Sequence, residues 1–323
     1  MATPYLDLQG AEMKIVNLDV STLGANADFS ELESFGSYMS YPLTSYDETY
    51  ERVKDADIIL TNKVVLDKPL LSKLPSLKLI VVTATGTNIV DVEYAKERGI
   101  PVKNAAGYST LSVAQHTLTF ALSLLSQMPY YDSYVKQGQW AKSACFTHLA
   151  QGRRDINGLA WGIIGLGAIG LRVAELATSF GAKVAYTSTS GKNTAQAYPH
   201  LALDELLAQS DIISIHAPLN PATKGLIDTH KLAMLKKDCV LINVGRGGIV
   251  DEQAVAARLK SGAQLYYACD VLDTEPMRSD HPFLDSSIQD RLLLSPHIAY
   301  AYQNSLKTLV QMSIDNVKEF LKA

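Results

Sequence analysis

The chain has 323 residues, of which 47% are hydrophobic and 19% are charged, and its formal net charge is -4. This composition is typical of a water-soluble globular protein with room for two domains, each with its own core. It excludes a nucleic-acid partner, because no basic block is present, and a membrane-spanning protein, because no apolar run is long enough.

In chain order, apolar strand-like runs alternate with helical patterns from residue 13 to the end. Residues 1–12 lack the features of a signal peptide and are predicted to be an N-terminal extension. The predicted strands are 14–19, 57–62, 79–83, 101–104, 159–164, 182–186, 212–216, 240–244, 265–269 and 292–295. The predicted helices are 112–127, 168–177, 204–208, 229–235, 251–260 and 305–322.

This alternation predicts an α/β fold of two Rossmann-like or flavodoxin-like domains with parallel sheets. The first domain would take residues 13–110 together with the returning helix 301–323, and the second would take residues 111–300. We expect an active-site cleft between the domains, since such sites lie at the carboxyl ends of parallel strands. Residues 130–154 are predicted to be irregular.

The three cysteines, Cys145, Cys239 and Cys269, are odd in number and widely spaced. They form neither a disulfide framework nor a metal-ligand spacing, so we expect no metal site. Cys239 and Cys269 lie in apolar runs typical of buried strands. This usage indicates a reducing compartment, and we expect the protein to be cytoplasmic.

Residues 159–170 predict a buried strand, a glycine-rich turn and the start of a helix. Gly165 permits the tight turn, Gly167 lets the backbone approach a pyrophosphate, and Gly170 lets the helix pack close to the strand. The first helical residues, Ala168 and Ile169, then present N–H groups and the positive end of the helix dipole to that pyrophosphate. The sequence therefore predicts a dinucleotide cofactor.

The strand after this helix ends without the acidic residue that usually holds the ribose 2′-hydroxyl of NAD. Ser188 and Thr189 stand there instead, followed by Ser190 and Lys192. Hydroxyls and a lysine are compatible with a 2′-phosphate, but such a run is also typical of a solvated turn. The cofactor is therefore NAD or NADP, with the preference open.

Three polar residues follow strands of the second domain. Arg246 lies in a glycine turn, Glu275 precedes a proline, and His297 follows one. Taken singly, each is more typical of a solvated charge, a loop carboxylate or a turn residue than of a catalytic group.

Taken together with the glycine turn, these residues resemble the D-isomer-specific 2-hydroxyacid dehydrogenases over nearly the whole chain. The first domain adds segments that look most like the glycerate dehydrogenase, or hydroxypyruvate reductase, branch. The motifs of the second domain that carry the resemblance are 165–170, 216–219 with Thr223, 243–251, 270–276 and 295–299, and those of the first domain are 62–64, 83–91 and 106–115.

The resemblance implies a role for each group. Arg246 would fork onto the carboxylate and carbonyl oxygens of a 2-keto acid. His297 would protonate the carbonyl oxygen while the nicotinamide delivers hydride to C2. Glu275 would orient His297 and stabilise its protonated form. The first domain would bind substrate and the second the dinucleotide.

The resemblance also implies binding contacts. Backbone N–H groups of Thr85, Gly86 and Thr87 would bind the substrate carboxylate, and Lys63 would attract the anion. Asp270 would contact the nicotinamide carboxamide, and His116 is expected only to pack on its helix. The remaining implied cofactor contacts are Ala217, Pro218, Thr223, Val244, Gly245, His297 and Ala299.

The implied activity is hydride transfer between NAD(P)H and C2 of a small 2-keto acid. Hydroxypyruvate/D-glycerate comes first, glyoxylate second and pyruvate/D-lactate third. The alternative is a cofactor-binding regulator of the corepressor kind without turnover. A phosphoglycerate dehydrogenase is disfavoured, because no arginine stands in residues 85–91 to hold a phosphate. A homodimer is expected from the family, with residues 130–154, including Trp140 and Phe146, supplying part of the contact.

Overall fold

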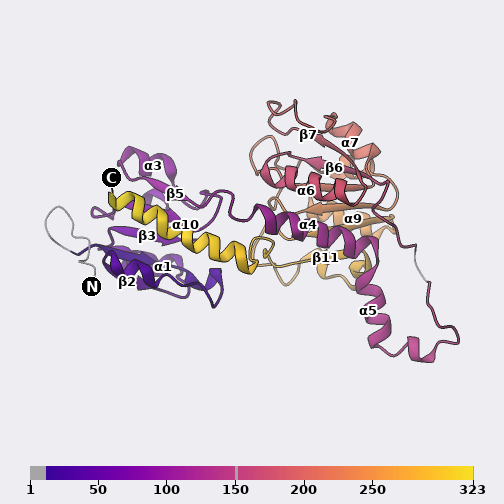
Figure 1. Cartoon of the computed structure of the whole chain (residues 1–323), viewed down its shortest axis with the longest axis horizontal. Helices are drawn as coiled ribbons and strands as arrows, with labels where there is room; N and C mark the ends of the chain where they lie inside the picture. The colour runs from indigo at the N-terminus through magenta and orange to yellow at the C-terminus, as the bar shows by residue number, and fades with distance from the viewer. Residues whose placement is uncertain (1–11, 150–151, 323) are drawn as a thin grey trace. The chain divides into compact units, whose positions relative to one another are not determined.

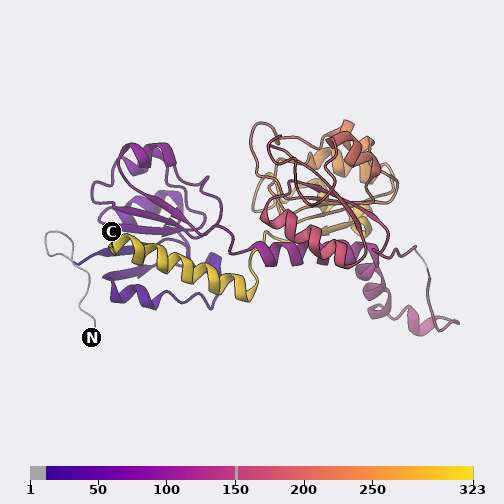
Figure 2. The ribbon, with the colours of Figure 1, turned by 45° about the horizontal axis from the view of Figure 1, so that its top comes forward.

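The computed structural model describes residues 12–149 and 152–322, so almost all of the predicted extension 1–12 lies outside the described residues. The chain forms two compact units, Met1–Ser109 with Ala301–Ala323 and Thr110–Tyr300. Each unit holds a parallel sheet with helices on both faces, which confirms the predicted fold class (Figures 1 and 2).

The sheet of the first unit has the order β2-β1-β3-β4-β5, in which every pair is parallel. This is the order of flavodoxin-like folds. Its strands are β1 (Lys14–Asn17), β2 (Ser37–Ser40), β3 (Ile58–Thr61), β4 (Leu79–Val82) and β5 (Val102–Asn104). β2 is not among the predicted strands, because this mostly exposed edge strand has the sequence Ser-Tyr-Met-Ser and carries no apolar run.

Successive residues of these strands point to opposite faces, and each face is covered by its own helices. Ile15 and Ile58 pack in the core beneath α10 (Gln303–Lys322). Val16 and Ile59 pack in the opposite core, which is covered by α1 (Tyr46–Val53), α2 (Lys68–Leu71) and α3 (Val92–Glu97). The C-terminal helix therefore completes the first unit, as Figure 1 shows in yellow.

The sheet of the second unit has the order β11-β10-β9-β8-β6-β7, again all parallel. The chain enters at β6, and the next two strands lie on opposite sides of it. Ligands of open α/β sheets bind outside the carboxyl ends of the strands at such a switch point. The strands are β6 (Ala160–Ile164), β7 (Lys183–Thr187), β8 (Ile212–Ile215), β9 (Cys239–Asn243), β10 (Leu265–Cys269) and β11 (Leu292–Leu294).

Two cores flank this sheet. One packs under α4 (Thr110–Leu125) and α6 (Ala168–Ser179), and the other packs under α7 (Leu203–Gln209), α8 (Thr229–Ala233) and α9 (Glu252–Lys260). Trp161 of β6 is fully buried, and its indole N–H donates to Ser214 Oγ at 2.9 Å. The 3₁₀ helices of the two units are η1 (Val20–Leu23), η2 (Ser30–Ser34), η3 (Trp140–Lys142), η4 (Pro282–Leu284) and η5 (Ser286–Arg291).

The prediction that residues 130–154 are irregular is wrong for their first part. A helix, α5 (Met128–Lys136), begins two residues before Tyr130, with Pro129 in its first turn, and the 3₁₀ helix η3 follows. Pro129, which marks the end of the preceding predicted helix, stands in the first turn of this new one, and no residue of α5 is fully buried. No helix in the described ranges is long and apolar enough to cross a membrane.

Candidate active site

The glycine-rich turn joins β6 to α6 at the carboxyl edge of the six-stranded sheet. Gly165 has a φ of +91°, where side chains are strained. A Cβ on Gly170 would lie 2.3 Å from the carbonyl oxygen of Gly165, so only glycine lets α6 approach this closely. A Cβ on Gly167, the N-cap of α6, would meet open space. The first N–H groups of the helix, which begins at Ala168, lack intrahelical partners and are suited to a pyrophosphate.

The loop after β7 folds back onto this turn. Asn193 donates its side-chain amide to the carbonyl oxygen of Leu166 at 2.9 Å, and its N–H donates to Ser188 Oγ at 3.3 Å. Ser188 and Thr189 are half-buried, whereas Lys192 is exposed. Asn193, which was not among the predicted site residues, therefore connects the Ser188 loop to the glycine turn.

The ends of β8 and β9 complete the edge at the switch point. A Cβ on Gly165 would lie 3.0 Å from Ala217 N, and one on Gly245 would lie 2.9 Å from Ala217 O. The residues that follow β6, β8 and β9 therefore lie in direct contact. Thr223 is fully buried, and its hydroxyl donates to Pro218 O at 2.6 Å. Thr223 thus shapes the loop that carries Ala217 and Pro218.

The turn that carries Arg246 is shaped by Asn243, which is 2% exposed at the end of β9. The amide of Asn243 accepts from Gly245 N at 3.1 Å and donates to Arg246 O at 2.9 Å. A Cβ on Gly247 would lie 1.9 Å from Leu272 O, so the turn packs directly on the loop that follows β10. Val244 is buried, while Arg246 is exposed and donates Nη1 to Gly245 O at 2.8 Å.

Glu275 and His297 form a hydrogen-bonded pair in this neighbourhood. His297 Nδ1 lies 2.7 Å from Glu275 Oε2, and Glu275 Oε1 accepts from Leu272 N at 2.9 Å. Because an ionised carboxylate only accepts, Nδ1 of His297 carries the hydrogen. Nε2 is then the ring atom that can exchange a proton. Tyr300 lies edge-on to the ring, with the centroids 6.0 Å apart.

Asp270 follows β10, is 2% exposed, and holds the segment that carries His297. Its Oδ1 accepts from Ile298 N at 2.8 Å, and its Oδ2 accepts from Ala299 N at 2.9 Å. Its carbonyl oxygen accepts from His297 N at 2.8 Å. The carboxylate expected to contact a nicotinamide carboxamide is therefore already bonded to the backbone of this segment.

In the first unit, Thr85, Gly86 and Thr87 follow β4. Asn104 donates to Thr85 O at 2.6 Å, and Thr85 Oγ1 donates to Ala105 O at 3.3 Å. Within residues 12–149 and 152–322, nothing accepts a hydrogen bond from the N–H groups of these three residues. The loop is thus held through the carbonyl and hydroxyl oxygens of Thr85, and backbone N–H groups arranged in this way are suited to an anion.

Lys63 lies beyond β3 and is oriented by Asp19, which follows β1. Asp19 is 2% exposed, and its carboxylate accepts from Asn62 N at 2.8 Å and from Lys63 N at 2.6 Å. Burial raises the pKa of Asp19, although these N–H groups act in the opposite direction. Both residues line a hollow of about 220 Å³ together with Thr22, Thr44 and Tyr46. Asp19 was not among the predicted site residues, although an acidic residue that follows the apolar residues of a strand could have indicated it.

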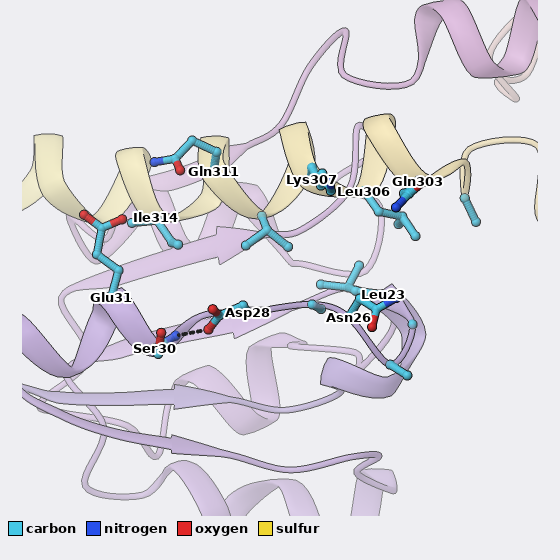
Figure 3. A pocket seen from close by; sticks show the side chains of 15 residues that line it. Leu23, Asn26, Asp28, Ser30, Glu31, Gln303, Leu306, Lys307, Gln311 and Ile314 are labelled. Atoms are coloured by element: carbon cyan, nitrogen blue, oxygen red, sulfur yellow. Dashed lines mark hydrogen bonds between the residues drawn. The ribbon is translucent and has the colours of Figure 1, made fainter.

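A larger hollow of the first unit lies elsewhere. It measures about 780 Å³ and opens between residues 23–31 and the first turns of α10, with Asp28 and Glu31 on one wall and Lys307 on the other (Figure 3). No residue of the predicted site lines it. Among the residues that the structure describes, no group of three or more His, Cys, Asp or Glu could hold a metal ion.

Comparison with known proteins agrees with this geometry. Residues 118–299 match the family model of the D-isomer specific 2-hydroxyacid dehydrogenase NAD binding domain. The hydroxypyruvate reductase of Blautia hydrogenotrophica is 35% identical over 318 residues, 96% of this chain and 97% of that protein. The glycerate dehydrogenase of Methylorubrum extorquens is 35% identical over 95% of this chain and 96% of that protein.

Solved structures of similar fold include dehydrogenases and reductases that bind nicotinamide cofactors. An acyclic imino acid reductase in complex with NADPH and D-Arg superimposes with a TM-score of 0.85 at 26% identity, covering 96% of this chain and 97% of that one. The D-lactate dehydrogenase of Aquifex aeolicus, complexed with NAD and lactic acid, gives a TM-score of 0.82 at 27% identity, with 96% of both chains covered. The chain therefore belongs to the D-isomer specific 2-hydroxyacid dehydrogenases and is a nicotinamide-dependent oxidoreductase of that family.

Proposed function

We propose that this protein reduces small 2-keto acids to D-2-hydroxy acids, with hydroxypyruvate as the preferred substrate, glyoxylate second and pyruvate third. The observation that carries the proposal is the 2.7 Å contact between His297 Nδ1 and Glu275 Oε2. It fixes the ring so that Nε2 can exchange a proton. The relatives named hydroxypyruvate reductase and glycerate dehydrogenase support hydroxypyruvate as the first substrate to test.

We assign the acid–base step to His297. In reduction, Nε2 gives its proton to the carbonyl oxygen, and in oxidation it takes the proton back. Glu275 stabilises the charged ring and holds its orientation, because both of its carboxylate oxygens are bonded. The nicotinamide cofactor, when bound, supplies the hydride for C2.

We assign substrate binding to Arg246 and to the backbone of residues 85–87. A guanidinium matches the geometry of a carboxylate, and Arg246 is exposed with one Nη bonded within its own turn. The N–H donors of residues 85–87 suit the same anionic group. The first unit would then act as the substrate-binding domain and the second as the dinucleotide-binding domain, with Lys63 attracting the anion.

The cofactor site would accept NADPH as well as NADH. Ser188, Thr189 and Ser190 follow β7, no carboxylate stands among them, and Lys192 adds a positive charge. An acid at this point would repel a 2′-phosphate, whereas hydroxyls and an ammonium group do not. The NADPH complex of the similar imino acid reductase is in line with this reading.

The test is a steady-state comparison of hydroxypyruvate, glyoxylate and pyruvate with NADH and with NADPH. We expect kcat/KM to fall in that order of substrates and both cofactors to be oxidised. The variant His297→Asn should lose about 10²–10⁴-fold in kcat with the cofactor Kd unchanged, whereas His230→Asn, at an exposed position on α8, should be normal. Cofactor binding without turnover of any 2-keto acid would favour the regulator instead.

We also propose a homodimer in a reducing, cytoplasmic setting. Phe146 is 87% exposed and Leu149 71%, and both follow α5, none of whose residues is fully buried. Apolar side chains exposed in one segment are typical of a contact surface, and a second copy is the expected partner. Sedimentation velocity should give twice the chain mass, and a shift to the monomer in Phe146→Asp, but not in Leu284→Asp, would support this surface.

A further inference from the structure

A chain of hydrogen bonds within the second unit connects α4 to the segment that carries His297. His116 Nε2 lies 2.9 Å from Ser295 Oγ, although the two residues are 179 positions apart in the sequence. Ser295 Oγ in turn donates to Asp270 Oδ1, which lies 3.8 Å from His116 Nε2. The side chains of His116 and Asp270 are 9% and 2% exposed. His116 therefore does more than pack on its helix, which corrects the expectation from the sequence.

The hydrogen bonds of Asp270 connect this network to the backbone around His297. Asp270 accepts from Ile298 N and Ala299 N through its carboxylate and from His297 N through its carbonyl oxygen. His297 itself has a φ of +54°, a conformation that residues other than glycine adopt only when their surroundings impose it. Asp270 thus holds the N–H of His297 through its carbonyl oxygen and the two following N–H groups through its buried carboxylate.

The positions of the hydrogens in the His116–Ser295–Asp270 network follow from which groups can donate. The Ser295 hydroxyl has one hydrogen, and it points to Asp270, because an ionised carboxylate only accepts. Ser295 Oγ must then accept from His116, so Nε2 of His116 carries a hydrogen. Burial lowers the pKa of His116, although Asp270 acts in the opposite direction, and Phe120 fixes the ring edge-on at a centroid distance of 4.5 Å.

We propose that His116 is a positioning residue for the reaction, acting through Ser295 and Asp270 on His297. Its Nε2–H keeps the Ser295 hydroxyl turned toward Asp270. Asp270, held in this way, fixes the backbone of residues 297–299 and so the place of the His297 ring. The proposal rests on the acid–base role of His297 proposed above.

Two substitutions of His116 distinguish the effect of losing the hydrogen-bond donor from the effect of changing the side-chain volume. His116→Leu fills the space but has no donor, whereas His116→Gln keeps an amide N–H at a similar reach. We expect His116→Leu to lower kcat about tenfold, which corresponds to the loss of one hydrogen bond, with the KM of the 2-keto acid and the cofactor Kd within about twofold. His116→Gln should recover most of kcat, and His116→Leu should add little to Ser295→Ala in the double variant.

An equal loss in the Leu and Gln variants, an additive double variant or an unchanged kcat in His116→Leu would overturn the proposal. The tautomer of His116 in the wild-type protein gives a second test. Nitrogen NMR of the imidazoles at neutral pH, with the His116 resonance assigned by its loss in His116→Gln, should show the hydrogen on Nε2. A hydrogen on Nδ1 alone would contradict the chain of contacts.

The His297→Asn variant distinguishes a failure of the proposed role of His116 from a failure of the proposed function. If His297→Asn retains turnover, the acid–base role fails and the positioning role fails with it. If His297→Asn is inactive while His116→Leu has normal kcat, the proposed function stands and only the role of His116 is wrong.

Discussion

At the scale of single residues, the two ends of the proposed cofactor-binding edge differ in how tightly their side chains are held. Asp270, Asn243 and Thr223 are buried, and each bonds to backbone that carries a predicted contact. The Ser188 hydroxyl lies in an exposed loop, and its contacts to Asn193 N and Ser190 Oγ are 3.3 and 3.4 Å. Cofactor preference is therefore the property of this site that a single substitution should change most easily.

We predict that Ser188→Asp shifts preference toward NADH. A carboxylate at the end of β7 can accept from a ribose 2′-hydroxyl and repels a 2′-phosphate. The ratio of kcat/KM for NADH to that for NADPH should rise about tenfold or more. Ala195→Asp, which adds the same charge at an exposed position of the same segment, is the control. Equal ratios in the wild type and in Ser188→Asp would place the 2′-group elsewhere.

At the scale of elements, the turn between β6 and α6 contains two glycines, Gly167 and Gly170, that are required for different physical reasons. Gly170→Ala puts a Cβ 2.3 Å from Gly165 O, so α6 must move away from the strand. This overpacking should lower the free energy of unfolding by about 1–3 kcal/mol. Gly167→Ala meets nothing within 4 Å and has an extended φ of −82°, so the fold should keep its stability.

Gly167→Ala should change cofactor binding rather than stability. The Cβ of Gly167→Ala would occupy the space that a pyrophosphate needs, so cofactor affinity should fall about tenfold or more while stability is kept. Urea unfolding and fluorescence titration with NADH measure the two quantities. Normal affinity in Gly167→Ala would mean that the pyrophosphate does not bind at this turn.

The elements that could be predicted from the sequence are those whose signal is local. Buried parallel strands such as β4 and β8 are runs of apolar residues, and the helix of residues 303–322 has an amphipathic pattern. The edge strand β2 is mostly exposed and carries no apolar run, and α5 is a short helix with Pro129 in its first turn, so neither has a clear local signal. The glycine turn could be predicted because its residues are contiguous. The pairing of His116 with Ser295 could not, because only the fold brings these residues together.

At the scale of the whole molecule, the chain uses the same arrangement twice. In the first unit the buried Asp19 follows β1 and holds the backbone of Asn62 and Lys63. In the second unit the buried Asp270 follows β10 and holds the backbone of residues 297–299. In both cases a carboxylate at the carboxyl end of a parallel strand fixes a neighbouring loop, which is where open α/β sheets bind ligands.

The most direct test of the central claim follows the hydride itself. Hydroxypyruvate should be incubated with NADH or NADPH that carries deuterium at the transferable position of the nicotinamide, and the product should be analysed by mass spectrometry and chiral chromatography. We predict D-glycerate with deuterium at C2, formed in step with cofactor oxidation. Unlabelled product, the L-isomer, or intact hydroxypyruvate with bound but unoxidised cofactor would contradict the account.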